Sequence, residues 1–213
     1  MVKKDSSTEE KIKNAARAVF HKKGYAATKT RDIAEEADIN LALLNYYFGS
    51  KENLFNVVVI ETLQTFFQSM LVAINDTDST LEAKIEIIVD KYTDLLINEP
   101  QIPVFIMSEI RNDAGQLLDR LPIKKMLWAT ILKQLTDERE KHNLPPMNPI
   151  YFITALLGLV VFPFTAGPIV KHLGDMSQED FNNMMLERKK LVPGWIMGII
   201  RSDIKEKKQK NRI

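Results

Sequence analysis

Apolar and polar residues recur along this chain with the period of an α-helix from one end to the other, and no stretch has the alternation of a strand. The first predicted helix opens with a capping-box sequence at residues 7–10 and ends near Gly24, since glycine suits a helix C-terminus. Its apolar face contains Ile12, Ala15, Ala16, Val19 and Phe20. This pattern predicts an all-α protein.

Two very short helices are expected next. They cover Thr30–Ala37 and Leu41–Tyr47, and Asn40 in the polar turn between them is suited to cap the second. Helices this short are marginal in water by themselves, so they need a scaffold. A long helix capped by Ser50 follows and is expected to reach about Ile74.

The remainder of the chain also predicts helices. A second capping box at residues 79–82 opens one of them, and prolines punctuate the next connection. The expected later elements are a helix to about Asn98, a short one after Pro100 and Pro103 to about Asn112, one over about 116–141 with Pro122 early in it, one beginning at Asn148-Pro149, and a last one opened by Ser177 to Asp180. The last helix has an apolar stripe that Pro193 must kink or restart, formed by Phe181, Met184, Met185, Val192, Trp195, Ile196 and Ile199.

The segment 148–170 carries no charge and is long enough to cross a bilayer. Two internal prolines, Pro163 and Pro168, and the lack of a flanking basic cluster argue against a membrane span. A helix that is apolar all round also suits a deep core or a subunit interface. We therefore expect this segment to be buried in protein, with no membrane as partner.

Composition limits the function. The net charge is +1 with a pI near 7.8, so any nucleic-acid binding depends on a local arrangement of charge. The chain has no cysteine and its N-terminus lacks the apolar core of a signal peptide, which favours the cytoplasm. His21, His142 and His172 are scattered, and there is no phosphate-binding loop or nucleophile motif. We therefore expect no enzyme, no catalytic residue, no metal site and no cofactor.

The two short helices have the requirements of a helix-turn-helix, whose second helix enters the major groove of DNA. Their buried side is expected to consist of Ile33, Ile39, Leu44 and Phe48. Asparagine on the exposed side can pair with adenine, apolar side chains can touch a thymine methyl, and tyrosine, threonine, lysine or arginine can bind phosphates. The alternative is that these helices form only the corner of a helical bundle.

The run from about Thr8 to Phe55 resembles the DNA-binding domain of the TetR family of bacterial transcriptional regulators. The residues in register with the family pattern are Gly24-Tyr25, Thr28, Ile33-Ala34, Ala37, Ile39, Leu44, Tyr47-Phe48 and Lys51. The chain departs from the pattern at Asp38, where the family has a turn glycine, and at Asn45, where a tyrosine is common.

The resemblance implies an N-terminal three-helix DNA-binding domain over 1–50 and a larger helical effector-binding and dimerisation domain over 51–213. It also implies a homodimer that binds a palindromic double-stranded DNA operator, most simply as a repressor released by a small, largely apolar effector. The DNA contacts expected from the residues and the resemblance together are Thr28, Lys29, Thr30, Arg31, Asn40, Leu41, Ala42, Leu43, Asn45, Tyr46, Tyr47 and Lys51.

Effector contacts are expected among apolar and aromatic residues of the helices in between, because such residues line apolar pockets. The candidates are Phe66, Met70, Tyr92, Phe105, Met107 and Trp128, each of which has ordinary core packing as its alternative. The rival function is a helical protein-interaction module that retains a degenerate helix-turn-helix. The basic tail, KEKKQKNRI, could attract DNA weakly or form a plain solvated end.

Overall fold

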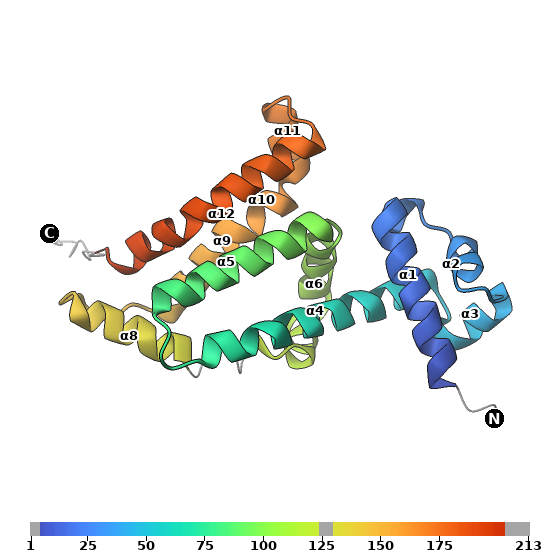
Figure 1. Ribbon diagram of the computed structural model, residues 1–213, viewed down its shortest axis with the longest axis horizontal. Helices are drawn as coiled ribbons and strands as arrows, with labels where there is room; N and C mark the ends of the chain where they lie inside the picture. The colour runs from blue at the N-terminus through green and yellow to red at the C-terminus, as the bar shows by residue number, and fades with distance from the viewer. Residues whose placement is uncertain (1–4, 124–129, 203–213) are drawn as a thin grey trace, which may run out of the picture. The chain divides into compact units, whose positions relative to one another are not determined.

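The computed structural model describes residues 5–123 and 130–202, and these residues form helices and no strand. The helices are α1 (Ser6–Ala27), α2 (Thr30–Glu36), α3 (Leu41–Phe48), α4 (Lys51–Asn75), α5 (Leu81–Asn98), α6 (Ile102–Arg120), α8 (Leu132–Lys141), α9 (Pro149–Val160), α10 (Phe162–Thr165), α11 (Gly167–Leu173) and α12 (Gln178–Ile200) (Figure 1). The all-α fold expected from the periodicity is confirmed.

The chain divides into two compact units. One contains residues 1–71 and 94–124, and the other contains residues 72–93 and 125–213. Both α4 and α5 therefore contribute to each unit. The predicted division at residue 50, between a DNA-binding and an effector-binding domain, is a functional one and stays a prediction.

The core of the first unit joins the three N-terminal helices. Ile12 of α1, Ile33 of α2, Leu44 of α3 and Leu54 of α4 are each completely buried. In this unit α1 packs against α2, and α2 packs against α3 (Figure 1). Burial of these apolar side chains holds helices that are too short to be stable alone. Of the predicted buried set, Ile33, Leu44 and Phe48 are buried, and Ile39 is half-buried.

Aromatic rings extend this core. Phe55 of α4 packs edge-on against Phe20 with ring centroids 5.0 Å apart, and it lies 4.5 Å from the ring of Tyr25. Phe105 of α6 packs edge-on on Phe55 at 5.8 Å. Such arrangements add to the stabilisation that burial alone provides. They make α6 part of the same unit as the N-terminal helices.

The start of α1 differs from the prediction. Asp5, and not Ser7, is the N-cap, and its carboxylate accepts the Ser7 backbone N–H at 3.1 Å. This carboxylate both satisfies an end donor and complements the helix dipole, so the N-cap lies two residues before the predicted one. Gly24 interrupts the helical dihedral angles of α1, at φ 74°, close to the predicted end.

The predicted helix over 116–141 is wrong as a continuous element. Helix α6 ends at Arg120 because Leu121 is extended (φ −111°, ψ 141°), and a residue before proline, here Pro122, disfavours the helical conformation. The predicted break after Asn112 is present within α6. Asp113 leaves the helical region there, and its carboxylate caps the following turn by accepting the Gln116 N–H at 3.0 Å.

The uncharged segment 148–170 is also not one helix. It forms α9, α10 and most of α11, with Pro163 and Pro168 in the first turns of the last two, where proline is tolerated. Asn148 caps α9 as predicted, since its side chain accepts the Ile150 N–H at 3.0 Å. No part of the segment is therefore a helix of membrane-spanning length.

Among the described helices, α4 alone is long and apolar enough to cross a membrane. A single helix of this kind is weak evidence for a membrane span, and 44% of its most apolar stretch is buried within the protein. The helix also carries Glu61, which is ion-paired with Lys13 and Arg17 of α1. A core helix accounts for these properties.

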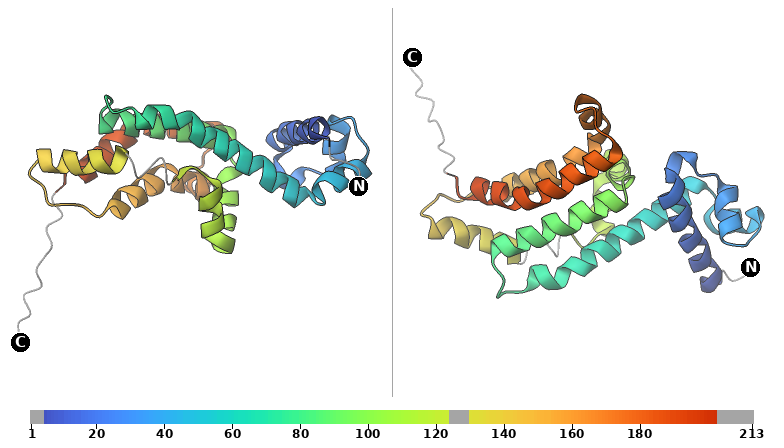
Figure 2. Two further views of the ribbon diagram at one scale, coloured as in Figure 1. Left: turned by 90° about the horizontal axis from the view of Figure 1, so that it is seen from below. Right: turned by 45° about the horizontal axis from the view of Figure 1, so that its top comes forward.

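Helix α12 organises the second unit. Ser177 and Asp180 form a reciprocal capping box at its start, with hydrogen bonds of 3.1 and 3.0 Å. The helix continues across Pro193 and packs against α8 and α9 (Figure 2). At its other end, the buried guanidinium of Arg139 donates to the carbonyls of Ile200 and Ser202 at 2.7 and 3.1 Å. These bonds satisfy C-terminal carbonyls that the helix itself leaves free.

Candidate nucleic-acid interface

The turn between α2 and α3 is a Schellman motif. The N–H of Ile39 donates to the carbonyl of Ala34 and that of Asp38 donates to Glu35, both at 3.0 Å. Asp38 has a φ of +48°, in the left-handed region that favours glycine. The departure from the family's turn glycine therefore keeps the turn geometry and places a strained aspartate in it.

Helix α3 begins as predicted. The side chain of Asn40 accepts the Leu43 N–H at 2.8 Å, which fixes the first turn. Leu44 and Phe48 anchor one side of the helix in the core. The opposite side contains the side chains predicted for the groove: Ala42, Asn45 and Tyr46 are exposed, and Leu41 and Leu43 are half-buried.

Tyr47 is half-buried and connects α3 to the start of α1. Its hydroxyl oxygen accepts the Asp5 backbone N–H at 2.9 Å. Its ring lies edge-on to Tyr46 at 5.5 Å. The hydroxyl predicted for a phosphate is thus placed beside the α1 N-terminus, where the helix dipole favours anions.

Lys51 and Thr28 close the other end of α1. The Lys51 ammonium donates to the carbonyls of Tyr25 and Thr28 at 3.0 and 2.9 Å and lies 4.3 Å from the centre of the Tyr25 ring. Thr28 is buried, and its hydroxyl donates to the Gly24 carbonyl at 2.7 Å. Their polar groups therefore position backbone in this structure. Their predicted contacts with DNA stay predictions.

Lys29 and Arg31 are exposed at the start of α2, and Thr30 is half-buried. The backbone N–H of Lys29 donates to the Asp32 carboxylate at 2.9 Å, and Lys23 lies 3.1 Å from the same group. The Lys29 N–H and then the Lys23 ammonium hold the pKa of Asp32 below its ordinary value. With Lys23, the exposed Lys29 and Arg31 place three basic side chains at the start of α2.

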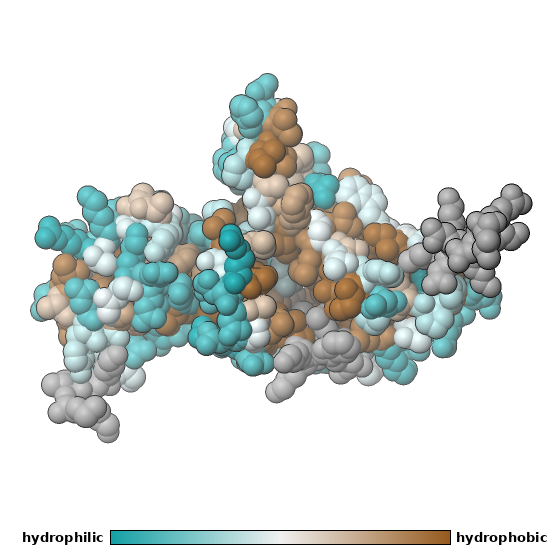
Figure 3. Space-filling view, turned by 180° about the vertical axis from the view of Figure 1, so that it is seen from behind, coloured by the Kyte–Doolittle hydropathy of each residue, from teal (hydrophilic) through white to brown (hydrophobic). Residues whose placement is uncertain are grey.

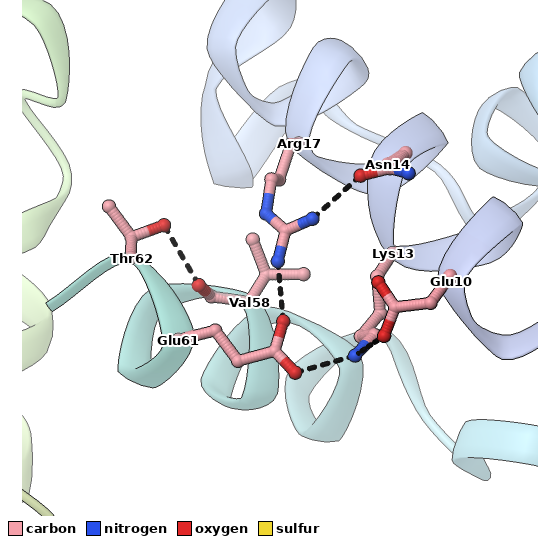
Figure 4. A network of polar contacts seen from close by, with 7 residues as sticks. All are labelled: Glu10, Lys13, Asn14, Arg17, Val58, Glu61 and Thr62. Carbon is pink, nitrogen blue, oxygen red and sulfur yellow. Dashed lines mark hydrogen bonds and ion pairs between the residues drawn. The ribbon is translucent and has the colours of Figure 1, made fainter. Parts of the chain in front are cut away.

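A network of charges, which the sequence analysis missed, joins α1 to α4 (Figure 4). Lys13, only 5% exposed, donates to Glu61 at 2.5 Å and is ion-paired with Glu10. Arg17 binds the second oxygen of Glu61. Burial opposes the charge on Lys13, but its hydrogen bonds with the two carboxylates outweigh burial and raise its pKa. The available signal was Glu61, which stands alone in the apolar run VVVIETLQTFF.

The structure places the predicted effector residues in different environments. Met70 is fully buried, Phe105 belongs to the aromatic core of the first unit, and Met107 is 46% exposed. Phe66 is half-buried and lines a surface hollow, and burial raises the pKa of the half-buried Tyr92. Trp128 lies outside the described residues. An effector site at these residues stays a prediction.

The described residues contain no group of three or more histidine or acidic side chains that could hold a metal ion. They offer instead a rigid pair of short helices with a projecting polar and aromatic side. That arrangement suits a groove of DNA.

Sequence comparison supports this interpretation. Residues 12–58 match the profile described as bacterial regulatory proteins of the tetR family. The probable HTH-type transcriptional regulator YttP of Bacillus subtilis (strain 168) is 26% identical over 201 residues, covering 92% of this chain and 95% of that protein.

Solved structures show the same fold. A TetR transcription regulator from Haloarcula marismortui has a TM-score of 0.65 at 15% identity, over 91% of this chain and 98% of that one. FadR from Bacillus subtilis in complex with stearoyl-CoA has a TM-score of 0.56 at 19% identity, over 86% of this chain and 97% of that one. These relatives are regulators and not enzymes, in agreement with the sequence-based expectation. The chain is therefore a DNA-binding regulator whose residues 12–58 match the TetR family of bacterial regulatory proteins.

Proposed function

We propose that this chain is a cytoplasmic homodimeric repressor that leaves a palindromic operator when a small, largely apolar effector binds. The observation that carries the proposal is the exposed side of α3, where Asn45 and Tyr46 project from a helix fixed by its cap and its buried residues. Two such helices, one from each subunit, would read half-sites about one DNA turn, roughly 34 Å, apart.

In this proposal Asn45 reads a base, and the tyrosines and basic residues bind phosphates. Asn45→Ala is expected to relax preference at one base position by about 1–3 kcal/mol. Fluorescence anisotropy with operator DNA and single-base variants of it measures this effect. The matched control is Asn183→Ala, which removes an exposed asparagine from α12. Equal preference in Asn45→Ala and the unchanged protein would contradict the assignment.

Tyr47→Phe separates the hydroxyl from the ring. We expect it to weaken binding to every sequence by a similar factor, because the proposed contact is to a phosphate. The same anisotropy titrations measure this change. A changed base preference without a general loss of affinity would reverse the roles assigned to Asn45 and Tyr47.

The second unit supplies a surface for dimerisation. Large apolar side chains are exposed on α9 to α12, and those on α11 are visible in the space-filling view (Figure 3). They are Ile150, Tyr151, Leu157, Phe162, Ile169, Leu173, Leu186, Leu191 and Trp195. Gly158, Gly194 and Gly198 have open space where a side chain would be, which would let another helix approach closely. A shared apolar surface of this kind suits a symmetric interface.

Size-exclusion chromatography with light scattering measures the molar mass of the protein and so tests whether it is a dimer. Leu157→Glu is expected to give a monomer, since it places a charge in the proposed interface. Val104→Glu, at a 66% exposed apolar site on α6, is the control and should leave the dimer intact. Dimers from both variants would exclude this surface.

The charge network is the proposed connection between effector and DNA. Because Glu61 of α4 holds both Lys13 and Arg17 of α1, a displacement of α4 would move the DNA-binding helices with it. The similarity to FadR, a regulator with bound stearoyl-CoA, supports an effector with a long apolar chain. Effector and operator would then oppose each other by the same coupling factor.

DNA binding itself is tested with a palindrome from the DNA flanking the coding region. We expect affinity to fall steeply and linearly with salt on logarithmic axes, since phosphate contacts release counterions. A scrambled duplex of the same length is the control. Absence of both binding and salt dependence would favour the protein-interaction module instead.

A further inference from the structure

Lys84 is a buried cation that contacts no counter-charge among the described residues. Its side chain is completely buried on α5. Within residues 5–123 and 130–202, its ammonium group has no hydrogen-bond partner. A buried charge without a partner is strongly destabilising, so such a group in a folded protein requires an explanation.

The location makes the charge more unfavourable. Lys84 lies in the first turn of α5, where its backbone N–H donates to the Thr80 carbonyl. The N-terminal end of a helix already has a partial positive charge, and a helical side chain leans toward that end. Burial accordingly lowers the pKa of Lys84, and the attraction of Asp76 compensates only in part.

Asp76, whose charge acts on Lys84, and Glu82, two residues before it, are occupied elsewhere. Asp76 is exposed in the loop before α5, and its carboxylate accepts the Asp78 N–H at 3.1 Å. Glu82 is exposed and paired with Arg201 at 3.5 Å. Neither supplies a direct bond to the Lys84 ammonium.

A second unpartnered polar atom belongs to the same end of α5. Gln134 of α8 donates its amide to the Ser79 carbonyl at 2.7 Å, which fixes it beside the first turn of that helix. In the described parts of the chain, its Oε1 atom is buried and accepts no hydrogen bond. One strong donor and one acceptor are thus both unsatisfied in this region, although native proteins rarely leave such atoms without a partner.

The surroundings are apolar. Leu81 and Ile88 are three and four residues from Lys84, on the same side of α5, and both are buried. Ile131, the N-cap residue of α8, and Leu135, next to Gln134 in that helix, are buried as well. An occupant of this region must therefore combine an anionic head group for Lys84 with an apolar remainder.

We propose that Lys84 and the N-terminus of α5 bind the anionic head group of an amphipathic effector, with Gln134 accepting a hydrogen bond from a water molecule bound to that head group. This inference rests on the proposed function and specifies its effector class: an apolar chain with a carboxylate or a phosphate. Binding would exchange an uncompensated charge for an ion pair. The differential affinity needed to shift the protein toward its effector-bound state would come from that exchange.

The experiment compares three probes of one chain length: dodecanoate, dodecanoyl-CoA and dodecanol, each below its micelle-forming concentration. Thermal shift and release of operator DNA are measured for the full-length dimer, for Lys84→Met and for Lys91→Met. Lys91→Met removes a half-buried lysine from the same helix and is the matched control. We expect at least one anionic probe to raise the melting temperature of the unchanged protein and of Lys91→Met more than dodecanol does.

In Lys84→Met, the affinity for the anionic probe relative to dodecanol is expected to fall by a factor of ten or more, while dodecanol and operator DNA still bind. A response to dodecanoate identifies a carboxylate, and a response to dodecanoyl-CoA alone identifies phosphates. The proposal is overturned if Lys84→Met keeps the preference, or if no anion exceeds dodecanol. Failure of the unchanged protein to bind operator DNA in the absence of any probe would instead refute the proposed function.

The melting temperature without ligand is a second readout. Removal of an unpartnered buried charge should raise it, whereas removal of a structural lysine with an unseen partner should lower it. A lower melting temperature of Lys84→Met would therefore also overturn the proposal.

Discussion

Two buried lysines in this protein have opposite electrostatic environments. Lys13, in the first unit, is held between Glu10 and Glu61, and its pKa is raised. Lys84, in the second, is buried among apolar residues without a bonded carboxylate in the described chain, and its pKa is lowered. Burial alone therefore does not determine what a charged residue does. The carboxylates that bind Lys13 make it a structural residue. No described carboxylate binds the Lys84 ammonium, so an external anion would stabilise it.

The largest expected effect is loss of stability on breaking the first site. Lys13→Met should lower the free energy of unfolding by about 3 kcal/mol, because Glu61 then keeps, among the described residues, only Arg17 as an ion-pair partner. Urea unfolding measures the change. The double variant Lys13→Met with Glu61→Leu should recover much of the loss, since it leaves no partly buried carboxylate behind. If Lys13→Met left the free energy of unfolding unchanged, the two lysines would not differ in their contribution to stability.

The second effect has the opposite sign. Lys84→Met should raise the free energy of unfolding by about 2 kcal/mol, because a methionine of similar volume removes a buried charge. The same urea titration applies, and Lys91→Met is the control for loss of a charge from α5. A loss of stability in Lys84→Met would show that the two lysines are both structural.

A smaller change in stability is expected at the turn between α2 and α3, independently of either lysine. Asp38→Gly should raise the free energy of unfolding by about 1 kcal/mol, because glycine adopts the left-handed conformation of the turn without strain. Asp38→Asn is the control for the charge and should give a smaller gain, as asparagine tolerates this conformation better than most residues. If glycine destabilised the protein, the turn would depend on the carboxylate rather than on its backbone conformation.

The smallest effect is a pH dependence of opposite sign at the two lysines. The ordinary lysine pKa is 10.5. Below that value the unfolded state binds more protons at Lys84 than the folded state does. The stability of the protein relative to Lys84→Met should therefore rise as the pH approaches 10.5. At Lys13 the folded pKa is the higher one, so its contribution stays complete below 10.5 and is lost as the pH rises through the folded value.

Urea unfolding at about pH 8 and about pH 10 tests the first of these trends. The stability gap between Lys84→Met and the unchanged protein should narrow at the higher pH, and the gap for Lys13→Met should not. If the stability differences for Lys84→Met and Lys13→Met changed in the same way between the two pH values, the assigned pKa directions would be contradicted.

Local signals predicted much of the fold. Asn40, Asn148 and Ser177 cap helices as expected, because side-chain capping depends on neighbouring residues only. The helix breaks at Leu121 and within 148–170 were not predicted, because the helical period of the apolar residues was weighted more heavily than the prolines in these segments. Prolines in first turns start new helices rather than bending old ones.

The candidate site divides in the same way. The exposed side of α3 followed from the period of its buried residues, so Asn45 and Tyr46 could be placed from sequence. The internal bonds of Thr28 and Lys51 could not, because they depend on how α1 ends and where α4 begins. The pairing of Lys13 with Glu61 and the isolation of Lys84 likewise arise from contacts between distant segments.

The first unit is discontinuous in sequence, since residues 94–124 return to complete it. During synthesis, Phe55 meets Phe105 only after the ribosome has released the intervening α5, so the N-terminal helices emerge with part of their aromatic core uncovered. The interval is a window for chaperones and proteases. A fragment that ends at residue 71 would lack Phe105 and would leave this side of Phe55 uncovered permanently.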